Sequence, residues 1–282
     1  SEVMFFSHHW PVFGKERIAA MMKDQHDTYR YIHDQTLRLA NQGHGPREIA
    51  EQIKLPASLM KHWWNRDYYG TVKHDAKAVY QMYFGWYDAN PASLDPLPRA
   101  EQGKRYVTFM GGAANVLKQS RASFDKGEYR WVAEVLSHLV AAEPKNVEAR
   151  SLLAQTYDQL GYRAESTAWR NAYLTGAYEL RHGEPKQGVN LASATELLNQ
   201  TAPEQFMQMF QVALNGPDAE DVKLVINFDF RDAGEQYVVT IENAVLHFRR
   251  GSAAKNANAT LALTRPMLVK LVTKQVGIKD VL

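Results

Sequence analysis

Two adjacent histidines near the start of the chain, His8 and His9, have the side chains best suited to metal chemistry. They follow a short apolar run, residues 3–6, which predicts a buried strand, and Pro11 then turns the chain out of the strand direction. Imidazole is a common metal ligand, and sites are often built on loops at strand ends. Neighbouring side chains in extended backbone point in opposite directions, so only one histidine is expected to face a metal. The alternative is a pair of ordinary loop histidines.

A second group of chemically able residues lies in the loop 65–70 and just after it. Gly70 permits a turn, and the Tyr69 hydroxyl and the His74 imidazole can donate hydrogen bonds to an anionic oxygen. Such donors stabilise negative charge that develops as an ester bond breaks. The alternative is that these aromatic rings pack in a core and that His74 is an interior histidine with ordinary partners.

One period of a helical repeat, residues 127–161, organises the middle of the chain. Gly127 and Gly161 lie 34 residues apart, which is the tetratricopeptide period. Between them, Pro144 ends one amphipathic helix and Asn146 caps the next. This pattern predicts a tetratricopeptide-like helix pair rather than a generic helical hairpin. Because a lone repeat cannot bury its apolar face, it needs flanking helices or a partner chain, and we expect a homodimer.

Further helices are expected on both sides of this repeat. The predicted ranges are 14–41, 46–53, 57–64, 102–124 and 163–181. In the first of them, Met22 and Tyr29 are among the positions expected to be buried. Gly111 and Gly112 mark a kink or a close helix contact within residues 102–124. Residues 46–64 have the outline of a helix-turn-helix, but the second helix is bulky and apolar, so we expect no nucleic-acid binding.

The pattern changes after residues 183–188, the clearest linker in the sequence. Beyond it, helices, alternating strand-like runs and a closing helix predict an α+β unit with an antiparallel sheet. The predicted helices are 194–200, 204–215 and 266–275, and the predicted strands are 222–230, 236–242, 245–249 and 259–264. In the second helix, Phe206, Met209 and Phe210 could line a pocket for a lipid or alkyl chain, or form a plain core.

Composition restricts the class of protein without identifying it. The 282 residues contain 33 Lys and Arg against 31 Asp and Glu, so the net charge of +2 offers no attraction to nucleic acid. The absence of cysteine excludes disulfides and thiolate metal sites in these residues. No apolar run reaches the length of a transmembrane helix, and the N-terminus lacks the pattern of a signal peptide.

Two motifs carry a resemblance to a known family. These are Ser-His-His-Trp-Pro at residues 7–11 and the segment 68–88, which begins Tyr-Tyr-Gly-Thr-Val and ends Gly-Trp-Tyr-Asp. With the order of the parts, they resemble the alkyl sulfatases with a metallo-β-lactamase-like fold. That family has a dizinc catalytic domain, a helical dimerisation domain and a C-terminal domain similar to sterol carrier protein 2. The His-x-His-x-Asp-His motif that supplies most of its metal ligands is absent from these 282 residues.

The resemblance implies roles for the residues singled out above. His8 would be the last histidine ligand of a site with two zinc ions, with His9 less favoured, and most ligands would lie outside this chain. The loop carrying Tyr69 would reach the active site and hold the sulfate group of an alkyl sulfate, with His74 the favoured contact and Tyr69 the second. The resemblance also favours a periplasmic or secreted location.

The expected architecture is therefore multidomain. Residues 1–42 would be the end of a metallo-β-lactamase-like αβ/βα catalytic domain. Residues 43–183 would be a mainly α, tetratricopeptide-like dimerisation domain, and residues 190–282 a truncated α+β domain like sterol carrier protein 2. We interpret the chain as a C-terminal fragment of a zinc-dependent alkyl sulfatase, inactive alone. The alternative is a non-enzymatic helical-repeat scaffold fused to a lipid-binding module.

Overall fold

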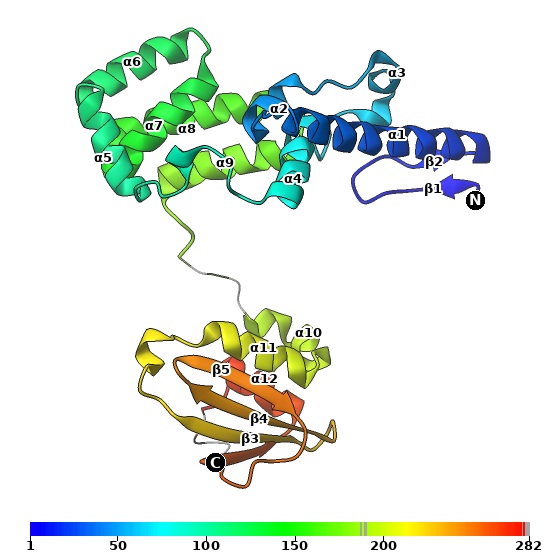
Figure 1. Ribbon diagram of the computed structural model, residues 1–282, viewed down its shortest axis with the longest axis vertical. Coiled ribbons are helices and arrows are strands. Elements are labelled where there is room, and N and C mark those ends of the chain that lie inside the picture. Colours follow the sequence, from blue (N-terminus) through cyan, green and yellow to red (C-terminus); the bar gives the residue numbers. More distant parts are fainter. Residues whose placement is uncertain (187, 189–190, 278, 280–282) are drawn as a thin grey trace. The chain divides into compact units, whose positions relative to one another are not determined.

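The computed structural model describes residues 1–186, 188, 191–277 and 279. The chain divides into two compact units, Ser1–Pro185 and Lys186–Leu282 (Figure 1). This division falls within the predicted linker 183–188. Gln187 in that linker and Asn190, the expected start of the last domain, lie outside the described residues, as do Asp280, Val281 and Leu282.

The first unit is helical, with a short antiparallel hairpin at its start (Figure 1). Its strands are β1 (Val3–Met4) and β2 (Val12–Phe13). Its helices are α1 (Lys15–Ala40), α2 (Pro46–Gln52), α3 (Ala57–Met60), α4 (Val72–Phe84), α5 (Arg99–Phe109), α6 (Ala113–Asp125), α7 (Tyr129–Ala142), α8 (Val147–Arg163) and α9 (Thr167–His182), with 3₁₀ turns η1 (Trp63–Asn65) and η2 (Pro91–Ser93).

The prediction of a buried strand over residues 3–6 is wrong. Only Val3 and Met4 form a strand, and Val3 and Phe5 are exposed. An apolar run shows that burial would be favourable, but what covers the run is set by tertiary contacts. Here β1 pairs with β2, so residues 7–11, which carry the two histidines, form the connection of a hairpin.

Helix α1 confirms the helix predicted over 14–41, but not all the side chains that were predicted to be buried on it. Ile18, Met21 and Ile32 are buried. Met22 and Tyr29 were expected to join them and are exposed, at 56% and 65% of their surface. Both line the cavity described below, because the apolar stripe of α1 is wider than the core that covers it.

The pair α7 and α8 confirms the helical hairpin at the centre of the chain. Asn146 caps α8 by accepting a hydrogen bond from the Ala149 backbone N–H at 3.0 Å. The facing sides of the two helices are fully buried, with Leu136, Leu139 and Leu152 in one hydrophobic core. Helix α7 ends at Ala142, before Pro144, as the sequence predicts.

A single helix over 102–124 is wrong, because the chain forms two helices, α5 and α6. Gly111 and Gly112, with φ of +85° and +90°, lie between them in a backbone region that favours glycine. The Gly112 N–H donates to the Val107 carbonyl at 2.8 Å, which closes α5 before α6 begins. The two glycines mark in the sequence where the helix is interrupted, but they do not show that α5 and α6 are separate helices.

Gly103 of α5 lies against the backbone of α7, and this contact gives a testable prediction. A Cβ at Gly103 would lie 2.5 Å from the His138 carbonyl oxygen and 3.2 Å from the Ala142 nitrogen. We expect Gly103→Ala to destabilise the helical unit by about 1–3 kcal/mol, although alanine favours a helix by about 1 kcal/mol over glycine. Urea unfolding followed by circular dichroism measures this.

The matched control is Gly176→Ala in α9. A Cβ there would lie 3.3 Å from the ring of Tyr157, a side chain that can shift. We therefore expect a much smaller change in the free energy of unfolding for Gly176→Ala. Equal effects of the two substitutions would show that the close approach of α5 and α7 has no particular cost.

Two other predicted helices have different bounds in the structure. The helix expected over 57–64 ends at Met60 and is followed by the 3₁₀ turn η1. The helix expected from residue 163 begins at Thr167, because Ser166 caps it by accepting from the Trp169 backbone N–H at 3.3 Å. These bounds place the loop 66–70 beside the start of α9.

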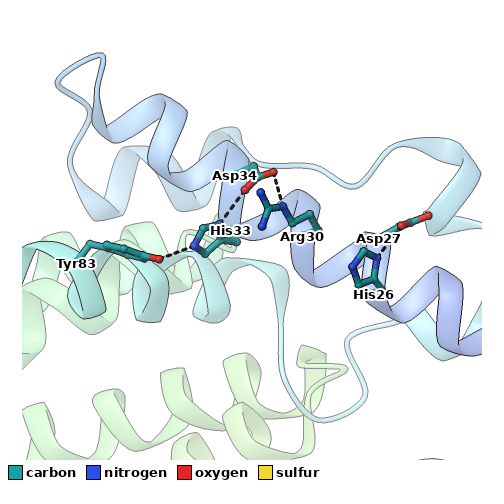
Figure 2. Close-up of polar contacts among 6 residues, drawn as sticks. All are labelled: His26, Asp27, Arg30, His33, Asp34 and Tyr83. Atoms are coloured by element: carbon teal, nitrogen blue, oxygen red, sulfur yellow. Dashed lines mark hydrogen bonds and ion pairs between the residues drawn. The ribbon is translucent and has the colours of Figure 1, made fainter.

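A chain of polar contacts joins α1 to α4 (Figure 2). The His33 Nε2 lies 2.8 Å from the Tyr83 hydroxyl, and its Nδ1 lies 2.9 Å from the Asp34 carboxylate, which also accepts from Arg30 Nε at 2.9 Å. The hydrogen bond from His33 holds the pKa of Asp34 below its usual range. The His33–Asp34 pair, which lies within α1, is present at neutral pH and is lost as pH falls through the lowered pKa of Asp34. The contact between His33 and Tyr83 joins α1 to α4, and so supports the loop that precedes α4.

The second unit is an α+β fold (Figure 1). Its helices are α10 (Thr195–Gln200), α11 (Pro203–Ala213) and α12 (Arg265–Val272), with 3₁₀ turns η3 (Leu191–Ala194) and η4 (Pro217–Ala219). Its strands are β3 (Leu224–Phe230), β4 (Glu235–Glu242), β5 (Val245–Arg250) and β6 (Ala259–Leu263). Phe206 of α11 and Val269 of α12 are buried in the same core as Phe230 and Tyr237, so these helices cover one face of the sheet.

The expected antiparallel sheet is only partly correct. The strand order is β5-β4-β3-β6, and β6 runs parallel to β3. The return of residues 251–258 across the sheet makes this possible. Asn227 holds that segment, because its side-chain amide donates to the Ala254 carbonyl at 3.0 Å and accepts from the Ala254 N–H at 2.8 Å.

Among the described residues, no helix is both long and apolar enough to cross a bilayer.

Candidate functional site

His8 and His9 lie at the edge of a cavity of about 500 Å³ in the helical unit. Besides the two histidines, its wall includes apolar residues of the hairpin and of α1 and polar residues of the loop before α4. Met21, Gln25 and Thr28 come from α1, and Asp67, Tyr69 and Asp75 come from the loop and from α4. The structure therefore brings together the N-terminal histidines and one member of the predicted sulfate-binding pair.

Tyr69 and His8 are in direct contact. Their rings stack with centroids 3.6 Å apart and planes 3° from parallel. Both residues also line a second cavity of about 500 Å³, whose wall includes Glu165 and Thr167. Residues 61 positions apart in sequence thus form one surface, on which the phenol ring of Tyr69 lies against the imidazole of His8.

His9 is packed among aromatic rings, whereas His8 is exposed and stacks on one ring. Its ring meets those of Phe6, Trp63 and Tyr68 edge-on. Burial lowers the pKa of His9, partly opposed by a hydrogen bond to the Trp64 backbone. Its Nδ1 is buried and has no hydrogen-bond partner among the described residues.

His74 lies in the first turn of α4 and does not line either cavity. Its Nδ1 accepts a hydrogen bond from the indole Nε1 of Trp169 at 3.1 Å. Because an indole N–H can only donate, the neutral imidazole of His74 carries its proton on Nε2. The two residues of the predicted sulfate-binding pair therefore have different surroundings, and only Tyr69 adjoins His8.

Two carboxylates of the first cavity were not selected from the sequence. Burial raises the pKa of Asp67 and of Asp75. Asp67 accepts from the Val72 backbone N–H at 3.2 Å and so fixes the turn before α4. The Thr28 hydroxyl oxygen, also in this wall, is buried without a partner among the described residues. Single acidic or hydroxyl residues have no sequence pattern that marks them, so only the fold shows this grouping.

The side chains near His8 and His9 do not form a complete metal site. In the part of the chain that the structure describes, no three His, Asp or Glu side chains converge as a metal-binding group. A catalytic zinc ion typically has three protein ligands. The exposed imidazole of His8 and the unpartnered Nδ1 of His9 are chemically suited to one corner of such a site. They do not amount to a complete one.

In the second unit, the three residues considered for an alkyl-chain pocket have different environments. Phe206 is fully buried in the core, and Phe210 packs against that core with its ring 6.4 Å from Phe228. Met209 is 37% exposed. Helix α11 thus turns Phe206 and Phe210 toward the sheet, and Met209 toward solvent.

Comparison with protein families gives two matches along the chain. The model described as alkyl sulfatase dimerisation matches residues 45–183, and the model described as alkyl sulfatase C-terminal matches residues 191–282. The chain is 45% identical over 279 residues to a linear primary-alkylsulfatase of Pseudomonas sp, covering 99% of this chain and 41% of that protein. It is also 45% identical to the Saccharomyces cerevisiae alkyl/aryl-sulfatase BDS1, covering 100% of this chain and 43% of that protein.

A solved structure agrees with these matches. The stereoselective inverting sec-alkylsulfatase Pisa1 from Pseudomonas sp. aligns with a TM-score of 0.91 and 40% sequence identity, covering 99% of this chain and 45% of that one. The chain therefore spans less than half the length of the relatives it matches. With the dimerisation and C-terminal models together matching most of its residues, the chain belongs to the alkyl sulfatase family.

Proposed function

We propose that this chain forms the dimerisation and C-terminal part of an enzyme that hydrolyses alkyl sulfate esters to an alcohol and sulfate. The observation that carries the proposal is the stack of Tyr69 on His8 at the junction of two cavities. A metal-binding imidazole and a hydroxyl donor must adjoin each other if both act on one sulfate group. The linear primary-alkylsulfatase and sec-alkylsulfatase relatives support the substrate class.

In this proposal the complete protein holds two zinc ions in a metallo-β-lactamase-like domain. His8 supplies one ligand and His9 is the less favoured neighbour, because the ring of His9 is enclosed by Phe6, Trp63 and Tyr68. When bound, zinc would supply Lewis-acid chemistry to the sulfate ester. The contribution of this chain is to orient the His8 imidazole, and the stacked ring of Tyr69 limits its rotation.

Tyr69 and His74 are the proposed donors to the sulfate group. The position of Tyr69 in both cavity walls supports it as the nearer contact. His74 is left with a single free donor, Nε2–H, since its Nδ1 is engaged by Trp169. Negative charge grows on the leaving sulfate as the ester bond breaks, so hydrogen bonds from these groups would strengthen in the transition state.

The remaining parts of the proposal concern the two folds. We assign α7 and α8 to a tetratricopeptide-like repeat, on the period and capping of residues 127–161, and the second unit to a fold like sterol carrier protein 2. Phe206, Met209 and Phe210 would border an alkyl chain there. Since Phe206 is fully buried, an alkyl chain could reach it only if α11 moved away from the sheet.

The proposal is tested by comparing the complete open reading frame that encodes these residues with the 282-residue chain alone. We expect the complete protein to release sulfate from dodecyl sulfate, with loss of activity after metal chelation. We expect the chain alone to bind less than one zinc ion per molecule after dialysis and to release no sulfate, because its described residues do not bring three ligands together.

Two results would contradict the proposal. Hydrolysis of dodecyl sulfate by the chain alone, with stoichiometric zinc, would show that it holds a complete site. If the zinc-loaded complete protein released no sulfate from primary or secondary alkyl sulfates but did bind alkyl chains, the lipid-binding scaffold would be favoured instead.

Dimerisation is expected of the helical unit. The family model over residues 45–183 is one for a dimerisation domain, and this unit exposes large apolar side chains such as Phe109 and Trp86. Covering such residues requires a partner surface, and a second copy supplies one. Sedimentation equilibrium at micromolar concentration should give the mass of a dimer. A stable monomer under these conditions would count against a homodimer.

A further inference from the structure

The loop that carries Tyr69 has little regular structure of its own. Residues 66–70 form neither helix nor strand. Backbone carbonyls away from water need hydrogen-bond partners, and a loop without them would not hold a side chain in one place. For the carbonyls of Tyr68 and Tyr69, the partners come from the start of α9, about one hundred residues later in the chain.

Two consecutive carbonyls of the loop accept hydrogen bonds from two consecutive residues, Ser166 and Thr167, at the start of α9. The Tyr68 carbonyl accepts from the Thr167 backbone N–H at 2.9 Å and from the Thr167 hydroxyl at 3.1 Å. The Tyr69 carbonyl accepts from the Ser166 hydroxyl at 2.5 Å. Ser166 is only 2% exposed, so this hydroxyl is shielded from competing water.

The geometry of α9 explains why its first residues can do this. The N–H groups in the first turn of a helix have no partner within the helix. Ser166 caps α9, and its hydroxyl accepts from the Trp169 N–H while donating to Tyr69. Thr167, the first residue of α9, directs its N–H to Tyr68 instead of to solvent.

Side-chain contacts strengthen the same junction. Glu165 pairs with Arg66 at 2.6 Å. Trp169 donates to His74 Nδ1 at 3.1 Å, which holds the start of α4, directly after the loop. Glu165 and Thr167 also line the second cavity together with His8 and Tyr69. Contacts of the α9 corner therefore bracket Tyr69 on both sides in sequence.

We propose that residues 165–169, the α9 corner, position Tyr69 for the sulfate ester and so couple the dimerisation helices to the site. This inference rests on the alkyl sulfatase function proposed above. Ser166, Thr167 and Trp169 are positioning residues in this arrangement, because they act through the Tyr69 loop and through His74. The ring of Tyr69 is fixed from one side by His8 and its backbone from the other by α9.

Thr167→Pro tests the corner with little effect on the helix. Proline is well tolerated at the first position of a helix, and Ser166 already has the extended backbone, φ −63° and ψ 122°, that suits a residue before proline. The substitution removes both the N–H and the hydroxyl that donate to Tyr68. In the complete enzyme we expect kcat for dodecyl sulfate to fall by about 10-fold or more with little change in KM, since misplacement by about 1 Å can cost as much as 10²-fold.

Val147→Pro is the matched control. Val147 is the first residue of α8, is 79% exposed, and follows an extended capping residue, Asn146, as Thr167 follows Ser166. It introduces the same residue at the same helix position away from the Tyr69 loop. We expect its kcat and melting temperature to remain close to those of the unsubstituted enzyme.

A double-substitution cycle with Tyr69→Phe separates positioning from a general effect on the fold. If the corner acts through the Tyr69 hydroxyl, Thr167→Pro should lower kcat by less than about 2-fold once Tyr69 is phenylalanine. Independent effects would multiply in the double variant. Multiplying effects, or a Thr167→Pro variant with normal kcat, would overturn the inference and leave the sulfatase function intact.

A second measurement does not depend on activity. In the 282-residue chain, the ring of Tyr69 should shift the NMR signals of the stacked His8 imidazole. We expect Thr167→Pro and Ser166→Ala to reduce this shift and Val147→Pro to preserve it. An unchanged shift in folded Thr167→Pro would overturn the inference, whether or not the complete protein hydrolyses alkyl sulfates. Failure of the complete protein to hydrolyse alkyl sulfates would contradict only the proposed function.

Discussion

His8→Ala in the complete protein is expected to lower turnover of dodecyl sulfate by more than about 100-fold. Removing a residue that only supports a metal ligand typically costs 10- to 100-fold in affinity or activity, so removing a ligand itself should cost more. The bound zinc should fall at the same time, and metal analysis of the dialysed variant measures that loss alongside kcat. The fold should survive, because the imidazole of His8 is exposed and its principal contact is one stacked ring.

His9→Ala is the comparison that assigns the ligand. The ring of His9 lies among Phe6, Trp63 and Tyr68, so its removal leaves a gap in an aromatic cluster. We expect a lower melting temperature with zinc retained. If His9→Ala loses zinc and His8→Ala keeps it, the unpartnered Nδ1 of His9 is the metal-facing nitrogen and the assignment of His8 is wrong.

Tyr69→Phe is expected to lower kcat by about 10²-fold, the lower end of the loss found when one donor to a developing anion is removed. Only the hydroxyl is lost, and the remaining ring can still stack on His8. The melting temperature should therefore change little, and KM should change less than kcat. Steady-state kinetics and thermal unfolding on one preparation measure all three quantities.

His74→Ala provides the contrast, because the sequence favours His74 over Tyr69 as the sulfate contact. The structure engages His74 Nδ1 with Trp169 and leaves Nε2–H as its donor. If Tyr69 is the nearer donor, His74→Ala should reduce the melting temperature more and kcat less than Tyr69→Phe does. A larger loss of kcat for His74→Ala than for Tyr69→Phe, with the fold intact, would restore His74 as the principal donor.

Local signals in the sequence were sufficient where a helix depends on its own residues. Asn146 and Pro144 set the ends of α7 and α8, and the apolar spacing between residues 131 and 160 identified their facing sides. The sequence predictions were wrong where packing against another element decides whether a residue is buried or how a strand pairs. Met22 and Tyr29 continue the apolar stripe of α1 but border a cavity. Strand β6 has an ordinary strand pattern, and nothing in that pattern reveals that it lies parallel to β3.

In the candidate site, too, local sequence signals identified some residues and tertiary contacts revealed the others. His8, His9, Tyr69 and His74 were identified because imidazole and phenol groups in motifs are recognisable from type and spacing. Ser166, Thr167 and Trp169 were not, because their contribution comes from contacts with residues 68–74, which lie about one hundred positions away. A serine at a helix start indicates a cap, but not which carbonyl its hydroxyl also reaches.

By itself, the sequence determined most helical and α+β elements and the residue types able to bind a metal or an anion. These follow from side-chain chemistry and short-range periodicity, which act within a few residues. The family was indicated separately, by the resemblance that residues 7–11 and 68–88 carry. Only the tertiary structure decided that Tyr69 stacks on His8, that His74 is engaged by Trp169 and that α9 holds the intervening loop. Those contacts join distant segments, and their geometry arises from how helices pack as a whole, which no local pattern encodes.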